Sequence, residues 1–233
     1  MWAGIALAKP LNRIDGIDHV FGNERLLHQA LTHRSFGAPH YERLEFLGDS
    51  LLNLVAADLL WKAHPHATEG DLSRLRSRLV RDATLAEIAK ELELSQSLKL
   101  GIGEKKSGGF CRESILADVV EALIGAVYLD AGFDRAYAVV SDLLATRLAK
   151  LPPADTLKDP KTKLQEHLQG QGVSLPEYQV LEEHGADHAK EFVVSCSVEG
   201  PWSPTKARAS NRRKAEQIAA DLMLKQILSG NKT

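Results

Sequence analysis

The chain carries at residues 42–50 the stretch ERLEFLGDS, in which acidic and apolar residues are interleaved. On an α-helix, Glu42, Glu45 and Asp49 follow one another at intervals of three and four residues, so they share one side of the cylinder. The leucines and the phenylalanine between them are typical of a helix that packs against a core. The stretch therefore predicts a helix that holds carboxylates close to the hydrophobic interior.

The most apolar part of the chain, residues 115–129, contains Asp118 and Glu121 as its only charged residues. These two positions are again three apart, which places both carboxylates on one side of a helix. Unpaired carboxylates in such apolar surroundings are costly to bury, or they take up a proton. A cation is therefore expected beside them.

Two kinds of cation could meet these carboxylates. One is a divalent metal, because an all-oxygen ligand set without His or Cys suits Mg²⁺ and not zinc. The other is arginine, since buried acid–arginine networks are common. The spacing alone leaves both alternatives open, and Glu69 is either a weaker ligand candidate or a capping or solvent-facing acid. The arginines available for ion pairs are Arg43, Arg74, Arg76, Arg78, Arg81 and Arg112.

Outward from these segments, the first 150 residues show apolar residues at helical spacing almost throughout. Asp71 is expected to be the N-cap of one of these helices. A glycine-rich break at residues 101–109 fits neither of the phosphate-binding glycine motifs. The pattern predicts an all-α domain with helices near residues 26–31, 44–59, 72–80, 82–92, 114–129 and 135–149.

Pro152 and Pro153 mark a domain boundary, because two prolines stop a helix and favour an extended connection. After them, β-branched and aromatic residues gather in short runs, followed by a long amphipathic helix pattern. The order α-β-β-β-α predicts a small α+β domain. Its elements are expected at residues 161–169, 178–183, 191–198, 203–209 and 211–228. We therefore expect a helical domain over residues 1–151, a linker over 152–158 and the second domain over 159–230.

The composition limits the class of protein. Of the 233 residues, 44% are hydrophobic and 26% charged, which is a globular composition. No apolar run reaches the roughly 18 residues of a membrane span, and the N-terminus carries no convincing secretory signal. Two cysteines far apart in the sequence do not suggest a disulfide framework, so a cytoplasmic protein without a membrane partner is expected. The net charge is −3 over residues 1–157 and +1 over residues 158–233, so neither half is a polycation.

The stretch at residues 42–50 resembles the signature of the ribonuclease III family. The resemblance extends over residues 12–229 and is to the compact bacterial form, which has one nuclease domain and one double-stranded-RNA-binding domain. It favours a metal over arginine as the cation. The other matching motifs, in the family's order, are LTHRS at 31–35, EGDLS at 69–73, the glycine-rich segment 101–109 and SILADVVEA at 114–122.

Carried over to this chain, the resemblance implies a Mg²⁺ site in which Mn²⁺ could also serve. Asp49 and Glu121 match the positions usually called catalytic, and Glu42 and Glu69 match further acidic positions of the same valley. Tyr41 stands where the family often has a polar residue such as asparagine, a departure that alters no ligand. The implied metal ligands are Glu45, Asp49, Asp118 and Glu121.

The resemblance also implies a reaction and an assembly. Family members are homodimers that meet near the position of Phe46, and each of the two sites in one cleft cuts one strand of double-stranded RNA. The expected products carry 5′-phosphate and 3′-hydroxyl ends with short 3′ overhangs, and ribosomal RNA precursors and other structured transcripts are the expected substrates. Hydrolysis by metal-activated water needs neither a protein nucleophile nor an organic cofactor. The alternative function is a non-catalytic RNA-binding protein that retains the fold, which the intact acidic set disfavours.

Three cations, Arg212, Arg213 and Lys214, stand at the start of the last predicted helix, where they oppose the helix dipole. Charge alone leaves open a solvated basic turn or a phosphate-binding site. The second domain resembles the double-stranded-RNA-binding domain, in which such cations clamp phosphates across the major groove.

That resemblance implies further RNA contacts, which read the shape of the duplex and its 2′-hydroxyl groups. The family's glycines before the basic cluster are replaced here by Ala207 and Ala209, and Asn211 stands where serine is common. The residues implied to meet the minor groove are Thr162, Gln165 and Glu166 on the first helix and His188 in a loop.

Overall fold

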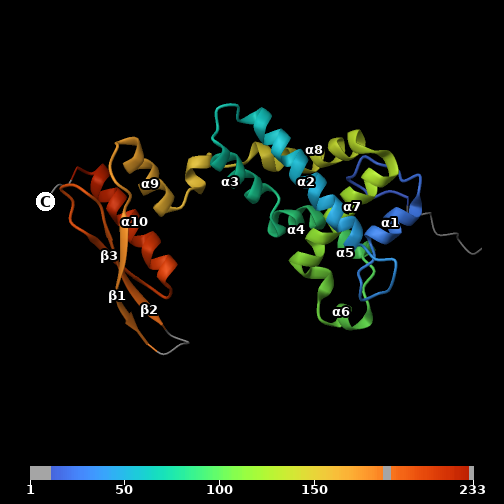
Figure 1. Cartoon of the computed structure of the whole chain (residues 1–233). Helices are drawn as coiled ribbons and strands as arrows, with labels where there is room; N and C mark the ends of the chain where they lie inside the picture. Colours follow the sequence, from blue (N-terminus) through green and yellow to red (C-terminus); the bar gives the residue numbers. More distant parts are fainter. Residues whose placement is uncertain (1–11, 186–189, 231–233) are drawn as a thin grey trace, which may run out of the picture. The chain divides into compact units, whose positions relative to one another are not determined.

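The computed structural model describes residues 12–185 and 190–230 of the chain. The chain divides into two compact units between Ala154 and Asp155. The first unit is helical, and the second combines helices with an antiparallel sheet (Figure 1). The predicted fold class, an all-α domain followed by a small α-β-β-β-α domain, is confirmed. Among the helices described, none has the length and hydropathy needed to cross a membrane.

The first unit is organised around α7 (Figure 1). This helix is apolar on nearly all sides because α1, α2, α4 and α8 pack against it. The elements of the unit are α1 (Glu24–Ala30), α2 (Glu42–Ala63), α3 (Glu69–Leu79), α4 (Asp82–Glu91), α5 (Leu94–Ser97), α6 (Ile102–Lys106), the 3₁₀ turn η1 (Gly109–Cys111), α7 (Glu113–Ala131) and α8 (Phe133–Ala149).

Two local predictions in this unit were wrong. Helix α3 begins at Glu69 and its N-cap is Thr68, whose hydroxyl accepts a hydrogen bond from the Asp71 backbone N–H at 3.2 Å. Asp71 lies inside the first turn, where its carboxylate accepts a hydrogen bond from the Thr68 hydroxyl at 2.8 Å. Thr68 and Asp71 are therefore joined by two reciprocal hydrogen bonds. The glycine-rich segment is also more ordered than expected, because α6 and η1 form within it and Gly108 takes the left-handed conformation between them.

The second unit packs two helices on one sheet. The strands are antiparallel in the order β1-β2-β3, with an irregularity in β1 between Val180 and Glu182. Leu164 of the first helix, Cys196 of the middle strand and Met223 of the last helix are fully buried in the core between them. The elements are α9 (Pro160–Gly170), β1 (Glu177–His184), β2 (Glu191–Ser197), β3 (Thr205–Ala209) and α10 (Arg212–Leu228), preceded by the 3₁₀ turn η2 (Ala154–Leu157).

Both helices of this unit begin at side-chain caps. Asp159 accepts from the Thr162 backbone N–H at 3.0 Å at the start of α9, and Asn211 accepts from the Lys214 backbone N–H at 2.8 Å at the start of α10. Asparagine therefore fills the capping role at a position where serine is common, because either side chain offers an acceptor oxygen. The cap fixes the turn that carries the basic cluster.

Candidate active site

Helices α2 and α7 approach so closely that their backbones touch. A Cβ atom at Gly48 of α2 would overlap the Glu121 carbonyl oxygen, and one at Gly125 of α7 would overlap the Leu44 carbonyl oxygen. Only glycine leaves room for this contact. It places the acidic positions of the two helices opposite one another.

Three carboxylates meet at this crossing. Oxygen atoms of Glu45, Asp118 and Glu121 all lie within 4.8 Å of one another, and each of the side chains is half-buried. We call this set the acidic cluster. Two of its members come from α7 and one from α2, so the group forms only when the helices pack.

Burial and mutual repulsion both favour the protonated forms of the acidic cluster. Burial raises the pKa of Glu121 to about 8, and the nearby charges of Asp49, Asp118 and Glu45 add to the rise. Burial likewise raises the pKa of Glu45 to about 7, with Asp118 as the strongest of its like-charged neighbours. The pKa of Asp118 is also raised by burial, although a hydrogen bond opposes the rise. Any positive charge near the acidic cluster is therefore too little to offset burial and the repulsion between the carboxylates.

Arginine does not supply that charge. Arg112 pairs with Glu104 at 2.8 Å and Arg34 pairs with Glu42 at 3.3 Å, both outside the acidic cluster. Within residues 12–185 and 190–230, no lysine or arginine forms an ion pair with any of the three clustered carboxylates. The donor set is all carboxylate oxygen, which fits a hard divalent cation such as Mg²⁺. Of the two alternatives left open by the sequence, this geometry favours the metal.

Tyr41 orients one member of the acidic cluster. Its hydroxyl donates a hydrogen bond to Asp118 Oδ2 at 3.1 Å, while its ring is buried and packs edge-on against His33 with 5.6 Å between ring centroids. Burial and the neighbouring Asp118 charge raise the pKa of the Tyr41 hydroxyl, so this group remains a donor at neutral pH. One carboxylate oxygen of Asp118 is thereby occupied, and the other stays available to a cation.

The remaining acidic residues of the predicted site lie outside this group of three. Asp49 is exposed and accepts from the Asn53 side-chain amide at 2.7 Å, although its charge still acts on Glu45 and Glu121. Glu42 is exposed and lies near Arg34 and His40. Glu69, at the start of α3, accepts from the Ser73 hydroxyl at 2.7 Å. The structure thus brings three of the four predicted metal ligands together.

A cavity of about 520 Å³ opens beside the acidic cluster. Glu45, Asp118 and Glu42 line it. Arg34 and Arg112 line it as well, and both are already paired with glutamates. The cavity therefore gives Glu45 and Asp118 access to solvent.

Six of the residues predicted to contact RNA lie on two helices, three on α9 and three in the first turn of α10. The Thr162 hydroxyl donates to the Asp159 carboxylate at 3.0 Å, and Glu166 pairs with Lys158 at 2.6 Å. Gln165 is exposed on the same helix. His188 lies outside the described residues.

The three basic residues of α10 differ in their partners. Arg212 is tied to Glu216 at 2.8 Å, and the same carboxylate binds Lys161 at 2.6 Å. Arg213 and Lys214 are exposed, and neither forms an ion pair within the described part of the chain. Two cations at the helix start therefore remain available to an anion.

Two features of the site escaped the sequence prediction. Gly48 and Gly125 were not singled out, although a glycine inside an apolar helical pattern is a signal of close packing. Tyr41 was noted only as a departure from the family pattern. Nothing in the local sequence indicates that its hydroxyl reaches α7, because the two segments are 77 residues apart.

Each of the two units matches a known protein family. The family described as Ribonuclease-III-like matches residues 23–148, and the double-stranded RNA binding motif matches residues 160–227. Two solved structures of the nuclease domain of ribonuclease III from Campylobacter jejuni are similar to this chain. One is 41% identical, with a TM-score of 0.54, and covers 55% of this chain and 90% of that one; its description concerns flexibility in a region involved in dimer formation. The other is 36% identical, with a TM-score of 0.57, and covers 64% of this chain and 100% of that one.

These matches include the helices that carry the acidic cluster and the module that carries the basic cluster. The chain belongs to the ribonuclease III family and is an endoribonuclease of double-stranded RNA.

Proposed function

We propose that this endoribonuclease is Mg²⁺-dependent, with Glu45, Asp49, Asp118 and Glu121 as metal ligands and Asp49 and Glu121 as the catalytic pair. The observation that carries the proposal is the meeting of half-buried carboxylates within 4.8 Å without a cationic partner in the described residues. Folding does not favour such a group for its own sake, since its members repel one another. A bound divalent cation removes the repulsion.

Each residue of the chain has a distinct part in this proposal. Glu45, Asp118 and Glu121 hold the cation, and Asp49 completes the site after its side chain turns away from Asn53. Tyr41 fixes Asp118 through its hydrogen bond. When bound, Mg²⁺ activates water as the nucleophile and stabilises charge on the phosphoryl group. Glu42 and Glu69 are proposed as further acidic groups along the same valley, and Mn²⁺ as a substitute metal.

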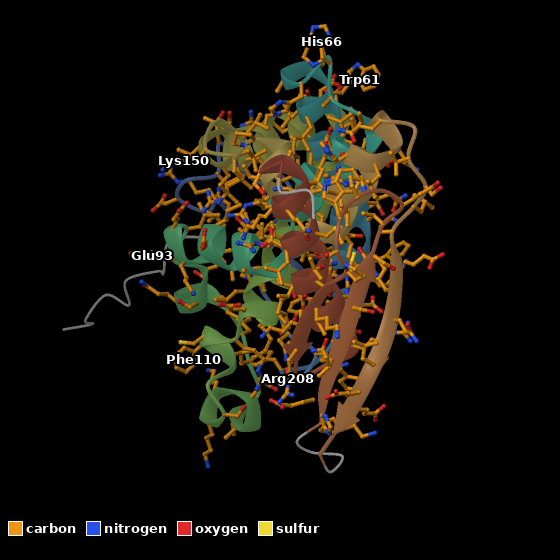
Figure 2. The ribbon with its side chains drawn as sticks, turned by 90° about the vertical axis from the view of Figure 1, so that its left-hand side faces the viewer. Trp61, His66, Glu93, Phe110, Lys150 and Arg208 are labelled. Atoms are coloured by element: carbon orange, nitrogen blue, oxygen red, sulfur yellow. The ribbon has the colours of Figure 1, made fainter. Side chains whose placement is uncertain are left out.

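We propose that the enzyme acts as a homodimer through the exposed side of α2. Phe46, Leu54 and Trp61 are 78%, 56% and 70% exposed on this helix, and they fall within one broad face of it. Figure 2 shows Trp61 projecting from the surface near the end of α2. Large apolar groups exposed in a row are typical of a protein–protein contact. Two copies would bring two acidic clusters into one assembly.

We propose that the second unit binds RNA through its two helices, α9 and α10, and through the predicted loop that carries His188. Thr162, Gln165 and Glu166 of α9 would meet the minor groove, with His188 in the next minor groove. Arg212, Arg213 and Lys214 of α10 would bind phosphates, because cations gathered at a helix start repel one another and the helix dipole until an anion arrives.

The products and targets follow from this assembly. Two sites, each cutting one strand, would leave 5′-phosphate and 3′-hydroxyl ends with short 3′ overhangs. Ribosomal RNA precursors and other structured transcripts, cut in the cytoplasm, are the proposed substrates. Residues 1–151 and 159–230 are proposed as the two domains, joined by the linker 152–158.

The test uses an end-labelled RNA duplex incubated with the protein in EDTA, Mg²⁺ or Mn²⁺. We expect cleavage only with metal and 5′-phosphate ends on the products. The matched variants are Glu121→Gln in the acidic cluster and Glu113→Gln at the exposed start of the same helix. Cleavage in EDTA, or equal loss of cleavage in both variants, contradicts the proposal.

A further inference from the structure

A second cavity, of about 440 Å³, lies on another side of the loop that borders the active site. The acidic cavity is lined by residues 33–35 of this loop, whereas Thr32 and residues 36–39 line the second one. Phe36, Ala38 and Pro39 contribute apolar surface to its lining. Cations stand around it, and none of the residues that line it is acidic. We call it the cationic pocket.

Local structure explains why these cations gather. Arg25, His28 and Gln29 lie three and four residues apart on α1, so they point to one side of that helix. Lys99 comes from a distant segment that is bonded to the end of α1: its backbone N–H donates to the Leu31 carbonyl at 2.8 Å. The backbone pairing thus holds the lysine against the basic face of α1.

The charges of the cationic pocket are not neutralised within the described residues. Lys99 is half-buried, and its ammonium donates to His28 Nδ1 at 3.2 Å without a carboxylate partner. An ammonium can only donate, so His28 Nδ1 accepts and the ring hydrogen lies on the other nitrogen, which can act as a donor. Arg25 is exposed and forms no ion pair in the described part of the chain. The arginines beside the acidic cavity, Arg34 and Arg112, are by contrast both paired with glutamate.

Phe36 adds a flat apolar surface to these donors. Its side chain is 57% exposed at the edge of the pocket. A sugar or base face can pack on such a ring while the attached phosphate meets the cations, an arrangement typical of nucleic-acid backbone contacts. A free carboxylate or inorganic anion would leave the ring uncovered.

We propose that the cationic pocket binds one phosphate–ribose unit of the RNA substrate, with the phosphate between Arg25 and Lys99 and the ribose against Phe36. The proposal adds one specific RNA contact of the helical unit, outside the acidic cavity. The inference rests on the proposed function only in taking RNA as the ligand. The helical unit would then bind RNA through a positively charged pocket, although the net charge of this unit is negative.

The test measures binding of the full chain to a labelled 30-base-pair RNA in EDTA, so that no cleavage intervenes. Arg25→Gln with Lys99→Gln should weaken binding about tenfold, as expected when a phosphate loses its charged hydrogen-bonding partners. The slope of log K against log salt should become shallower by about 0.9 for each phosphate that the variant no longer neutralises. Phe36→Ala should weaken binding without changing that slope.

The matched control is Lys90→Gln with Lys150→Gln, which removes the same charge from exposed positions elsewhere on the helical unit. We expect no change in affinity from this control. Equal weakening by the two double variants would assign the effect to net charge and overturn the proposal. Unchanged binding by the Arg25/Lys99 double variant would also overturn it.

Two further measurements keep the result decisive. If melting shows that the double variant is unfolded, Arg25→Gln alone is used, because the Arg25 side chain is exposed and forms no hydrogen bond or ion pair with the described residues. Adenosine 5′-monophosphate is titrated in parallel, and its binding without any effect on the RNA would assign the pocket to a free nucleotide instead. Failure of the proposed cleavage would appear separately, as absence of metal-dependent cutting by the unaltered protein.

Discussion

Glu121 and Glu216 are both glutamates on helices that pack into a core, yet their surroundings are opposite. Glu216 of the second unit is only 8% exposed and binds Lys161 at 2.6 Å and Arg212 at 2.8 Å. Burial by itself would raise the pKa of Glu216, but these two partners outweigh burial and lower it. Glu121 of the helical unit faces other carboxylates, and its pKa rises to about 8.

The comparison separates a structural acid from a functional one. A buried acid whose charge is balanced by side chains of the same fold is stable without a ligand. A buried acid surrounded by like charge is a candidate for binding a cation from outside the chain. Glu216 is thus neutralised by cations of its own unit, whereas the acidic cluster has no such ion pair among the described residues, which supports the proposal of a metal there.

The comparison predicts its largest effect on catalysis. Glu121→Gln should lower RNA cleavage at saturating Mg²⁺ on the order of 10³-fold, since removal of one group that stabilises the transition state typically costs 10² to 10³. The melting temperature in EDTA should be unchanged or higher, because a neutral amide relieves the repulsion. A large fall in melting temperature in EDTA would mean that Glu121 is a structural acid after all.

The next effect concerns metal affinity. Tyr41→Phe should weaken Mn²⁺ binding, measured by titration without RNA, about tenfold, because loss of a group that orients a metal ligand typically costs 10- to 100-fold. Tyr137→Phe is the matched control: its hydroxyl also donates to an aspartate, Asp58, at 2.6 Å, but away from the acidic cluster. Equal affinity in the two variants would remove Tyr41 from the site.

Stability of the second unit should change by a smaller amount. Glu216→Gln should lower the free energy of unfolding by about 1–2 kcal/mol, because two charged hydrogen-bond donors lose their partner. Asp221→Asn, which breaks an exposed ion pair with Lys225 on the same helix, should cost no more than about 0.5 kcal/mol. Chemical denaturation that reports on the second unit measures the loss of unfolding free energy in each variant. Similar losses in both would show that the ion pairs of Glu216 stabilise the fold no more than an exposed ion pair does.

The smallest effect is the pH dependence of the metal-free protein. In the folded state the pKa values of Glu121 and Glu45 are about 8 and about 7, above the usual value of 4.5. The folded state then holds more protons than the unfolded state between pH 4.5 and 8, so stability in EDTA should fall as the pH rises through this window. The fall should be on the order of 1 kcal/mol, allowing for solvent screening. Saturating Mg²⁺ should flatten it, and a rise with pH in EDTA would contradict the assignment.

Much of this architecture could be predicted from periodicity and motif. The order of helices and strands follows from apolar spacing, and the glycine break, the proline pair and the basic cluster are local signals. Glu45 and the pair on α7 were singled out because acids interrupt apolar helices. Only the resemblance to the family indicates that these acids share one site, because the spacing of residues within a helix says nothing about the distance between two helices.

The rest depends on contacts between distant segments. Tyr41 reaches Asp118 across the core, and Lys99 reaches α1 through a backbone pairing. No local pattern encodes these choices, because each is decided by where a second segment packs. The start of α3 is different, because Thr68 and Asp71 have the spacing of a capping box and their hydrogen bonds are local, so the sequence itself favours Thr68 as the cap.

The backbone contact at Gly48 and Gly125 has a consequence for metal binding. Because main-chain atoms set the separation of α2 and α7, the acidic cluster is preorganised before any cation arrives. A cation at the proposed site would then have no helix movement to drive, and its binding energy would appear directly as added stability of the folded state. Thermal unfolding of the helical unit should accordingly shift upward with the logarithm of metal concentration, so the melting curve serves as a metal titration.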